Sequence, residues 1–542
     1  MNRQSLYLLI PCTLSAVLLS LPWLLPHCGA FALVGFVPLL IADAVATQCR
    51  LKRFWLLHYY TFVLWNALTT FWVCNATLGG GIFAVLANAL QMSVVWGVFR
   101  FSKRYFKGPL PYLFLAAMWI AWERKYFSVD ISWPWLTLGN AFAQSTGSIQ
   151  WYAFTGTLGG SLWIWAVNLS FFGMIAALSD GGWHRWNNVA RAAAVTGVVL
   201  VTAGPVVLSK AIYNSYDERS EGSLKVMVAQ PSFDPYEKLE HVPQSEQTAT
   251  LVSLFEKGFA QHPSDSTGYL LMGPETFTSD VILNDVWASP TVRSLTAMLD
   301  GHKGNALLFG AASHEFHSSA APPSPLARKS GDSWVTAHNV AMLFDGSQTT
   351  QIYRKSKLVV GTELTPYPKI FVPLDEWLAP KFGMYSLMGR DEGQKEVTLL
   401  NYGGVPFGSV VCYESIYGEY CTEYVRKGAK FLAVITNDAW WGDTPGYRQH
   451  LSYSCLRAIE TRRDIARCAN TGISGFINQR GELVDSCAWW EKTVMSGEVN
   501  LNSEQTFFVR NGDITGRVST LVFLLFAALL VVKAVLARFS KR

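Results

Sequence analysis

The stretch PFGSVVCYE, residues 406–414, predicts a buried strand that runs into a reactive turn. Its valines extend a run that is apolar on both faces, which is typical of a central strand with helices packed outside it. Cys412 closes the run, and polar residues follow it directly. Similar apolar runs occur on either side of it in the sequence: LKVMVAQ (224–230), GYLLMGPE (268–275), ALLFGAA (306–312), HNVAMLF (338–344) and KFLAVITN (430–437).

Helical segments accompany these strands. Residues 246–260 and 447–468 carry apolar side chains at helical spacing and predict amphipathic helices. Strands that are apolar on both faces, combined with such helices, predict an α/β layered domain.

Long apolar stretches flank this domain. Of the 542 residues, 50% are hydrophobic and only 15% are charged. A membrane span needs about 20 apolar residues. The candidates by hydropathy are 6–25, 29–48, 54–74, 78–99, 109–122, 155–178, 190–209 and 518–537. The sequence therefore predicts a multi-pass α-helical membrane bundle of about eight spans. Its expected division is a bundle over 1–210, the α/β domain over 211–517, and a last span with a tail over 518–542.

Basic residues in the short loops predict the orientation. They follow the second, fourth and sixth spans and end the chain, as Arg50, Lys52, Arg53, Arg100, Lys103, Arg104, Lys107, Arg185, Arg191, Arg538, Lys541 and Arg542. Because cytoplasmic loops carry an excess of Lys and Arg, the N-terminus is expected in the cytoplasm and residues 211–517 outside. Arg124 and Lys125 break the alternation, and an interior pairing with Glu123 is expected to accommodate them.

Tryptophan is abundant, with 21 residues in the chain. Trp133, Trp135 and Trp151 fall in the stretch 129–154, between two predicted spans. Since Trp favours the membrane–water interface, this stretch is expected to lie along the outer surface of the membrane.

The charge and cysteine patterns exclude several functions. The net charge of +5 is modest, and the basic tracts adjoin apolar runs, which favours membrane anchoring over nucleic-acid binding. None of the nine cysteines forms a CxxC pair, which argues against a zinc ribbon. No metal or cofactor is expected, and at least one cysteine of the α/β domain is expected to be a free thiol.

Three short signals lie at strand ends or in the loops that follow. They are Gly273-Pro274-Glu275-Thr276, Tyr353-Arg354-Lys355 with Glu363 eight positions beyond Lys355, and Val411-Cys412-Tyr413-Glu414. In layered α/β domains, sites assemble at the carboxyl ends of strands. A thiol, a carboxylate and an ammonium suffice together for acyl transfer without a metal.

Each residue type has a chemical task. Only the thiolate of Cys412 attacks well, and Glu275 can take the thiol proton as general base. Lys355 would favour the thiolate and stabilise an oxyanion, with the N–H of Tyr413 as a second donor. We therefore expect the sulfur to be ionised beside the other two groups. Taken singly, each residue has a plainer interpretation: a packed cysteine, a helix-capping glutamate and a solvated lysine.

The order Glu, Lys, Cys within Pro-Glu, Tyr-x-Lys-x-x-Leu and Cys-Tyr-Glu resembles the carbon–nitrogen hydrolase (nitrilase) superfamily. Such a domain between an apolar N-terminal bundle and one C-terminal span resembles the apolipoprotein N-acyltransferase family within it. Further matching pieces are Trp133-Pro134-Trp135, Thr436-Asn437-Asp438-Ala439-Trp440-Trp441-Gly442, Gln449-His450, Arg457-Ala458-x-Glu460 and Arg467-x-x-Asn470-Thr471-Gly472-x-Ser474.

The resemblance implies an αββα sandwich and a ping-pong reaction in a bacterial cytoplasmic (inner) membrane. Cys412 would take an acyl group from a membrane phospholipid, with Glu275 as base and Lys355 stabilising the oxyanion. The acceptor would be the N-terminal amine of an apolipoprotein that already carries diacylglycerol, in the final step of lipoprotein maturation. Glu363, Tyr413 and Glu414 fall on supporting positions; Trp440, with Trp441 and Tyr236, falls near the substrate pocket.

The chain departs from the family pattern in places. Val359-Val360-Gly361-Thr362 stands where the family commonly has Val-Pro-Phe-Gly before the supporting Glu363. The family has a Trp shortly after the first strand of the domain; here it is absent, and Tyr236 is the nearest aromatic residue. Gly273 stands where a Trp often precedes Pro-Glu. These changes concern the lipid pocket and one loop, and they leave the catalytic residues in place.

Two other functions fit parts of the pattern. A membrane-anchored amidase or nitrilase-type hydrolase would use the same residues with water as acceptor. An inactive scaffold or a transporter would use the membrane bundle alone. A transporter predicts charged groups inside the spans, where Asp43 is the obvious acidic candidate.

Overall fold

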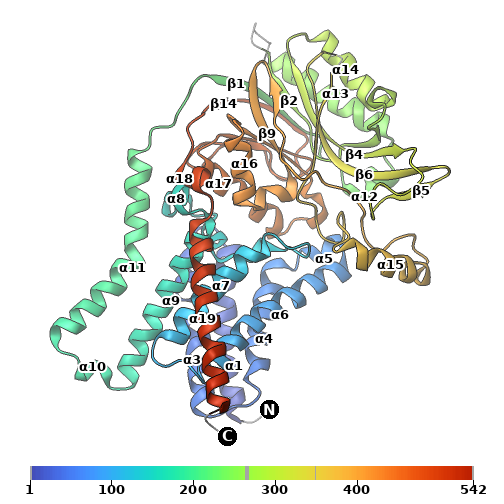
Figure 1. The fold of residues 1–542 in the computed structure, drawn as a ribbon. Coiled ribbons are helices and arrows are strands. Elements are labelled where there is room, and N and C mark those ends of the chain that lie inside the picture. The colour runs from blue at the N-terminus through green and yellow to red at the C-terminus, as the bar shows by residue number, and fades with distance from the viewer. Residues whose placement is uncertain (1–2, 263–267, 348, 540–542) are drawn as a thin grey trace. The chain divides into compact units, whose positions relative to one another are not determined.

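A computed structural model describes residues 3–262, 268–347 and 349–539, and the chain divides into two compact units (Figure 1). Unit 1 comprises Met1–Val129, Trp133–Tyr216 and Asn511–Arg542. Unit 2 comprises Asp130–Ser132 and Asp217–Arg510. Lys541 and Arg542, which contributed to the predicted orientation, lie outside the described residues.

Unit 1 is helical throughout its described part. Its longer helices are α1 (Arg3–Leu24), α3 (Val37–Gln48), α4 (Phe54–Thr70), α6 (Leu78–Ser102), α7 (Leu110–Tyr126), α9 (Thr157–Ser179), α11 (Asn188–Ser215) and α19 (Ile514–Phe539). Its short helices are η1 (Gly29–Phe31), α2 (Ala32–Gly35), α5 (Val73–Ala76), η2 (Pro134–Leu136), η3 (Leu138–Phe142), η4 (Thr146–Ser148), α8 (Tyr152–Thr155) and α10 (Gly182–Arg185).

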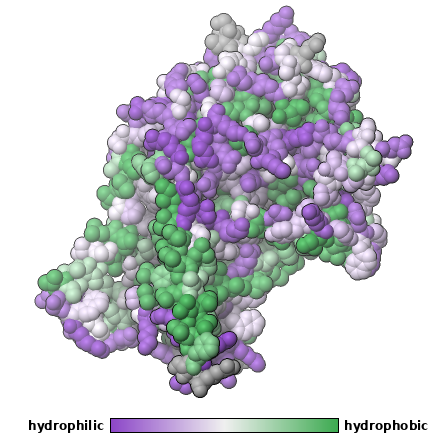
Figure 2. Space-filling view, in the orientation of Figure 1, coloured by the Kyte–Doolittle hydropathy of each residue, from purple (hydrophilic) through white to green (hydrophobic). Residues whose placement is uncertain are grey.

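Six segments of unit 1 are long and apolar enough to cross a membrane, as predicted. They are Leu6–Leu24, Gly29–Gln48, Leu78–Ser102, Thr157–Ser179, Asn188–Ser215 and Ile514–Phe539. The other two predicted spans, 54–74 and 109–122, correspond to α4 and α7, each of 17 residues. Apolar side chains of α19 cover its surface (Figure 2), which is what a helix facing lipid requires. The chain is a membrane protein.

The predicted span over 29–48 is interrupted at Phe36, between α2 and α3. The side chain of Asn168, buried in α9, replaces the lost helical hydrogen bonds. Its Oδ1 accepts the Phe36 N–H at 2.7 Å, and its Nδ2 donates to the Ala32 carbonyl at 2.8 Å. A broken helix at membrane depth needs such a partner, because lipid offers no hydrogen bonds.

Two expectations about charged residues need revision. Asp43 is buried and forms ion pairs with Arg100, at 2.7 Å, and with Lys103, so its charge is neutralised inside the bundle. The expected pairing of Glu123 with Arg124 is wrong. Glu123 instead accepts the Leu138 N–H at 2.8 Å, and Arg124 lies 3.6 Å from Asp513.

The Trp-rich stretch 129–154 does not lie along a surface. It folds into short helical turns, and Trp135 and Trp151 are 1% and 7% exposed. Trp133 and Trp135 stack at 5.3 Å, and Trp72 packs against both rings. The prediction of an interfacial segment was therefore wrong, because these rings are buried by other parts of the protein.

Unit 2 contains two β-sheets. The first has the order β14-β1-β2-β4-β6-β5, with β3 beside β4 and β7 beside β6; the second has the order β13-β12-β11-β10-β9-β8. The strands of the first sheet are β1 (Ser223–Gln230), β2 (Leu270–Met272), β3 (Thr278–Ile282), β4 (Ala306–His317), β5 (Arg328–Ser330), β6 (Ser333–Phe344), β7 (Gln351–Arg354) and β14 (Thr493–Asn500). Those of the second are β8 (Leu400–Tyr402), β9 (Val405–Val411), β10 (Leu432–Thr436), β11 (Ile465–Ala469), β12 (Gly475–Ile477) and β13 (Leu483–Ser486).

Helices cover the outer faces of the two sheets (Figure 1). All the helices and helical turns of unit 2, including those that do not cover a sheet, are α12 (Pro235–Glu240), α13 (Gln244–Gln261), η5 (Val286–Ala288), α14 (Pro290–Gly301), α15 (Pro368–Leu378), η6 (Ala379–Phe382), η7 (Cys412–Ile416), α16 (Gly418–Arg426), η8 (Asp438–Trp441), α17 (Pro445–Thr461) and α18 (Phe507–Asn511). One apolar core joins α13 and α14 to the first sheet. The sheets face each other where the Cys468 thiol of β11 lies 3.3 Å from the carbonyls of Ala229 and Met272. The predicted α/β sandwich is confirmed.

All six predicted strands are present, but the second helix was predicted too long. The segment 447–468 is helical only to Thr461, because Arg462 adopts a left-handed backbone with φ 50°. Ile465–Ala469 then forms β11, parallel to β10. Periodicity missed this break because β11 is short and buried, and because charged side chains precede it.

We predict that Asn168→Leu destabilises unit 1. The change would leave the Phe36 N–H and the Ala32 carbonyl without their partner, at a cost of about 1–3 kcal/mol. Thermal unfolding in detergent measures the effect. Ser170→Ala is the control, since it removes only a hydrogen bond to Ala166 within the same helix. Equal melting temperatures for the two variants would contradict the assigned role.

Candidate active site

The three predicted catalytic residues converge in unit 2. Each follows a strand: Glu275 comes after β2, Lys355 directly after β7, and Cys412 directly after β9. All are buried, with exposures of 4%, 1% and 8% in that order. The Lys355 Nζ lies 2.9 Å from Glu275 Oε1, and both charges act on the Cys412 thiol. The structure therefore brings together a thiol, a carboxylate and an ammonium.

Lys355 lies between two carboxylates. Its Nζ donates to Glu275 Oε1 and to Glu363 Oε1, each at 2.9 Å. Burial alone would lower the pKa of Lys355, but the carboxylates of Glu275 and Glu363 outweigh it and hold that pKa well above its ordinary value. Lys355 is therefore a permanent ammonium. The unusual loop before Glu363 still binds it, since the Val359 N–H donates to Glu363 Oε2 at 2.7 Å.

Asn339, on β6, holds the same pair of carboxylates from another side. Its Nδ2 donates to Glu275 Oε1 and to Glu363 Oε1, both at 2.8 Å. The second oxygen of Glu275 accepts the Asn437 N–H at 3.1 Å. With the Lys355 ammonium, three donors thus fix the orientation of the Glu275 carboxylate, as a general base would require.

Cys412 occupies a strained turn. Its φ of 51° is left-handed, a region that L-residues other than Gly, Asn and Asp seldom adopt. The turn ends β9 and begins η7, so the side chain leaves the sheet at the strand's carboxyl end. Strain of this kind persists only where surrounding contacts enforce it, and it marks functional sites.

The thiol of Cys412 is neutral at rest. Burial raises its pKa well above the ordinary value, and the Glu275 carboxylate raises it further, while Lys355 acts in the opposite direction. The expectation of a resting thiolate is therefore wrong. The proton stays on sulfur until a base removes it, and Glu275 is the carboxylate that acts most strongly on this thiol.

Glu414 ties the cysteine turn to the lysine loop. Its Oε2 accepts the Val411 N–H at 2.8 Å, while its Oε1 accepts the N–H groups of Ser356 at 2.7 Å and Lys357 at 3.2 Å. The Tyr353 hydroxyl adds a bond of 2.5 Å. Because these donors come from both sides of the site, Glu414 fixes the distance between Cys412 and Lys355.

Comparison with known proteins shows the family of the chain. Residues 177–507 match the carbon–nitrogen hydrolase family, and residues 15–170 match the apolipoprotein N-acyltransferase N-terminal domain. The chain belongs to the apolipoprotein N-acyltransferases of the carbon–nitrogen hydrolase family. The predicted resemblance is confirmed.

Relatives in this family align over almost the whole chain. The apolipoprotein N-acyltransferase of Chlorobaculum tepidum is 28% identical over 518 residues, covering 93% of each chain. That of Geobacter metallireducens is 24% identical over 507 residues, covering 92% of this chain and 91% of its own. Among solved structures, Saccharomyces cerevisiae Nit3 of the nitrilase superfamily is 15% identical, with a TM-score of 0.37, covering 53% of this chain and 93% of its own.

Tyr413 has a structural role that its family position suggested. It is 4% exposed, and its hydroxyl donates to the Ser132 carbonyl at 3.0 Å. The Ser132 hydroxyl in turn lies 2.9 Å from the Tyr417 hydroxyl. Both tyrosines of the cysteine turn are therefore fastened to the Asp130–Ser132 segment of unit 2.

The predicted substrate-binding aromatics split into two groups. Tyr236 is 49% exposed and packs edge-on against Trp440, with ring centroids 5.5 Å apart. Trp441 instead packs against the buried ring of His450 at 5.4 Å. Tyr236 and Trp440 thus form one aromatic pair, whereas Trp441 packs against His450; both tryptophans are partly exposed.

Sequence reasoning missed three residues near the thiol. Asn339 lies in a strand that was predicted, but its amide gave no signal of its own. Asp438 and His450 belong to quoted motifs, yet neither was assigned a role. Ligand atoms of Cys412, Asp438 and His450 lie within 4.8 Å of one another. Both His450 nitrogens are already within hydrogen-bond distance of protein oxygens, so hydrogen bonding accounts for this group without a metal.

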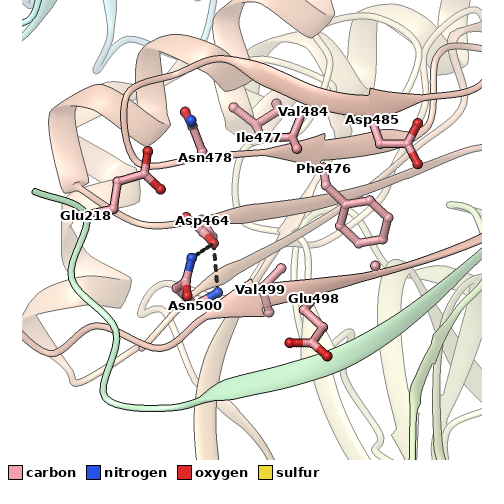
Figure 3. A pocket seen from close by; sticks show the side chains of 11 residues that line it. Glu218, Asp464, Phe476, Ile477, Asn478, Val484, Asp485, Glu498, Val499 and Asn500 are labelled. Carbon is pink, nitrogen blue, oxygen red and sulfur yellow. Dashed lines mark hydrogen bonds between the residues drawn. The ribbon is translucent and has the colours of Figure 1, made fainter. Parts of the chain in front are cut away.

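A cavity of about 370 Å³ lies elsewhere in unit 2 (Figure 3). Its lining includes Glu218, Asp464, Phe476 and Asn500, and none of the predicted catalytic residues. Asp464 precedes β11, at the strand end opposite to the loops that carry the catalytic group. This cavity is therefore separate from the candidate active site.

We predict that Lys355→Met destabilises unit 2 strongly. The change would leave Glu275 and Glu363 buried together without a counter-charge, at a cost of about 3–5 kcal/mol. Thermal unfolding of the full chain in detergent measures the loss. Lys329→Met, in an exposed position of β5, is the control and should leave the transition unchanged. A Lys355→Met protein as stable as the control would contradict the assignment of Lys355 as the central counter-charge.

Proposed function

We propose that this chain N-acylates bacterial apolipoproteins through an acyl-thioester on Cys412. The acyl donor is a membrane phospholipid, and the acceptor is the α-amine of an N-terminal cysteine that already bears diacylglycerol. The observation that carries the proposal is the buried group of Cys412, Glu275 and Lys355, in a chain that matches both domains of the apolipoprotein N-acyltransferases.

The first half of the reaction forms the thioester. Glu275 takes the proton from the Cys412 thiol, and the sulfur attacks the ester carbonyl carbon of the phospholipid. Lys355 and the N–H of Tyr413 stabilise the oxyanion of the tetrahedral intermediate. The carbon–oxygen bond then breaks, and Glu275 returns the proton to the departing glycerol oxygen. The products are the acyl-thioester and a lysophospholipid.

The second half consumes the thioester. The lipoprotein amine attacks the thioester carbonyl carbon and gives a proton to Glu275 as the carbon–nitrogen bond forms. The carbon–sulfur bond breaks, and the same proton returns to sulfur. Glu363, Asn339 and Glu414 support both halves, because they hold the base, the ammonium and the cysteine turn in fixed positions.

The aromatic pair of Tyr236 and Trp440 is suited to apolar substrates. Tyr236 lies in α12, which follows β1, and Trp440 lies in η8, which follows β10. Large aromatic surfaces bind acyl chains by burial and keep water from a reactive intermediate. We assign this pair to the acyl or lipoprotein pocket, and Trp441 to the packing of its inner wall.

The location we propose is the bacterial inner membrane, with unit 2 on the periplasmic side. The alternation of basic loops in the sequence supports this orientation. Both substrates are lipids that reside in the bilayer, so a membrane enzyme reaches them by lateral diffusion.

Cys412→Ala should abolish the acyl-enzyme, and Cys412→Ser should leave at most a trace. Loss of the nucleophile lowers the rate by on the order of 10³-fold or more. Intact mass measurement after exposure to phospholipid detects the adduct, and a diacylated lipopeptide reports the N-acyl product. Cys487→Ala is the control cysteine. An adduct on another residue, or release of free fatty acid without N-acyl product, would refute the transferase mechanism; the second result favours the hydrolase.

The orientation is tested with fused reporters. A reporter placed after Lys210 should be external, and one placed after Arg542 should be cytoplasmic. Accessibility to a membrane-impermeant label distinguishes the two sides. The opposite labelling pattern would overturn the proposed topology and leave the chemistry of the site untouched.

A further inference from the structure

The strained turn at Cys412 is held through its own carbonyl oxygen. Two side chains contact that oxygen: the Ser415 hydroxyl at 2.8 Å and His450 Nε2 at 3.0 Å. His450 lies on α17 and is fully buried. A left-handed residue with its carbonyl fixed in this way cannot relax toward an ordinary backbone without breaking both contacts.

The partners of His450 determine its protonation state. On one side, Nδ1 lies 2.8 Å from Asp438 Oδ1, which accepts only. On the other side, Nε2 faces the Cys412 carbonyl, which also accepts only. The Ser415 hydroxyl donates its hydrogen to the same carbonyl, so its oxygen also acts as an acceptor toward Nε2. Arg467 Nη2 also lies 3.2 Å from Nδ1, but its shorter contact, at 2.7 Å, is with Asp438 Oδ2. An imidazolium, which donates from both nitrogens, satisfies the three acceptors: Asp438, Ser415 and the Cys412 carbonyl.

Asp438 is the anchor of this arrangement. Despite its burial, the positive charges of Arg467 and His450 lower the pKa of Asp438 to about 2, so it is a carboxylate. Arg467 Nη2 binds its other oxygen at 2.7 Å, and the Thr436 hydroxyl adds a bond of 2.8 Å. The charges that face His450 are therefore one carboxylate and one guanidinium, from η8 and β11.

The geometry points to His450 as a positioning residue of the acyl transfer, an imidazolium that Asp438 holds in place and that clamps the Cys412 carbonyl. The clamp aims the thiol at the acyl carbon and at Glu275. This role rests on the proposed function, in which Cys412 is the nucleophile. It adds to the Glu–Lys–Cys group a second network, Arg467–Asp438–His450, that acts on the backbone of the nucleophile.

Alkylation of Cys412 tests the clamp without requiring either lipid substrate. The full chain in detergent is treated with iodoacetamide from pH 6 to pH 10, and the Cys412 peptide is quantified by mass spectrometry, since the other cysteines also react. Three proteins are compared: the wild type, His450→Asn and His450→Gln. Asn keeps a contact with Asp438 and cannot reach the carbonyl, whereas Gln reaches the carbonyl and lacks the charge.

Both variants lack the charge of His450, so the difference between them reports the contact with the carbonyl. Because the pKa of Cys412 lies well above its ordinary value, the rates are compared at pH 10. With His450→Asn, we expect the rate of alkylation at pH 10 to fall about tenfold or more, because the turn relaxes. With His450→Gln, we expect a rate within about threefold of the wild type. Asp464→Asn, a buried substitution at the separate cavity of Figure 3, is the control and should reproduce the wild-type profile.

The inference fails if His450→Asn keeps the wild-type rate at pH 10, or if both variants lose it equally, since neither result fits a carbonyl clamp. Thermal unfolding identifies a variant that does not fold, and Ser415→Ala then tests the same carbonyl from its other contact, with a smaller loss of rate expected. Absence of an acyl adduct on the wild-type Cys412 would defeat the proposed function instead, and the alkylation comparison would still decide the role of His450.

Discussion

The buried ammonium of Lys355 is the constraint on which the site depends. An unpaired charge cannot remain in the interior of a protein, so its environment must supply compensating carboxylates. Glu275 and Glu363 do so at 2.9 Å each, and Asn339 cross-links the two. Glu275 lies 80 positions from Lys355 in the sequence, whereas Glu363 lies only 8 positions from it. Their pairing with Lys355 therefore joins the loop after β2 to the loop after β7 and stabilises unit 2 around the site.

Burial and the surrounding charges explain why the Cys412 thiol is unreactive until a base removes its proton. Burial raises the pKa of the Cys412 thiol and the Glu275 carboxylate raises it further, so the thiol stays protonated. On one side of the site the Lys355 ammonium faces two carboxylates, whereas in the Arg467–Asp438–His450 network two cations face one carboxylate. Two networks of opposite net charge thus meet at Cys412. A proton transfer from sulfur to Glu275 redistributes charge between groups that are already fixed, so little reorganisation accompanies it.

Much of this could be predicted from the sequence because strand ends are visible there. Apolar runs placed Glu275 and Cys412 at the carboxyl ends of strands, and each of those strands is parallel to a neighbour. The short strand before Lys355, β7, was not predicted, and it pairs antiparallel to β6. Asn339 and His450 escaped notice because their partners lie 64 and 38 positions away, and no local pattern reveals such contacts. The helix over 447–468 was overextended for a related reason: Arg462 turns left-handed under tertiary contacts that periodicity does not report. Burial of Trp135 was mistaken for interfacial placement, since Trp is favoured in both environments.

Burial of the thiol has a consequence for the choice between transfer and hydrolysis. In the proposed mechanism, a thioester on Cys412, a residue that is only 8% exposed, would meet little bulk water, and the reaction could not begin until a base is in place. An acceptor that carries its own lipid chains brings binding energy with it, which water lacks, and can use that energy to place an amine at the carbonyl carbon. A lipid-bearing amine therefore competes with water for the thioester through binding as well as through nucleophilicity. The burial that keeps the Cys412 thiol protonated therefore also favours transfer over hydrolysis.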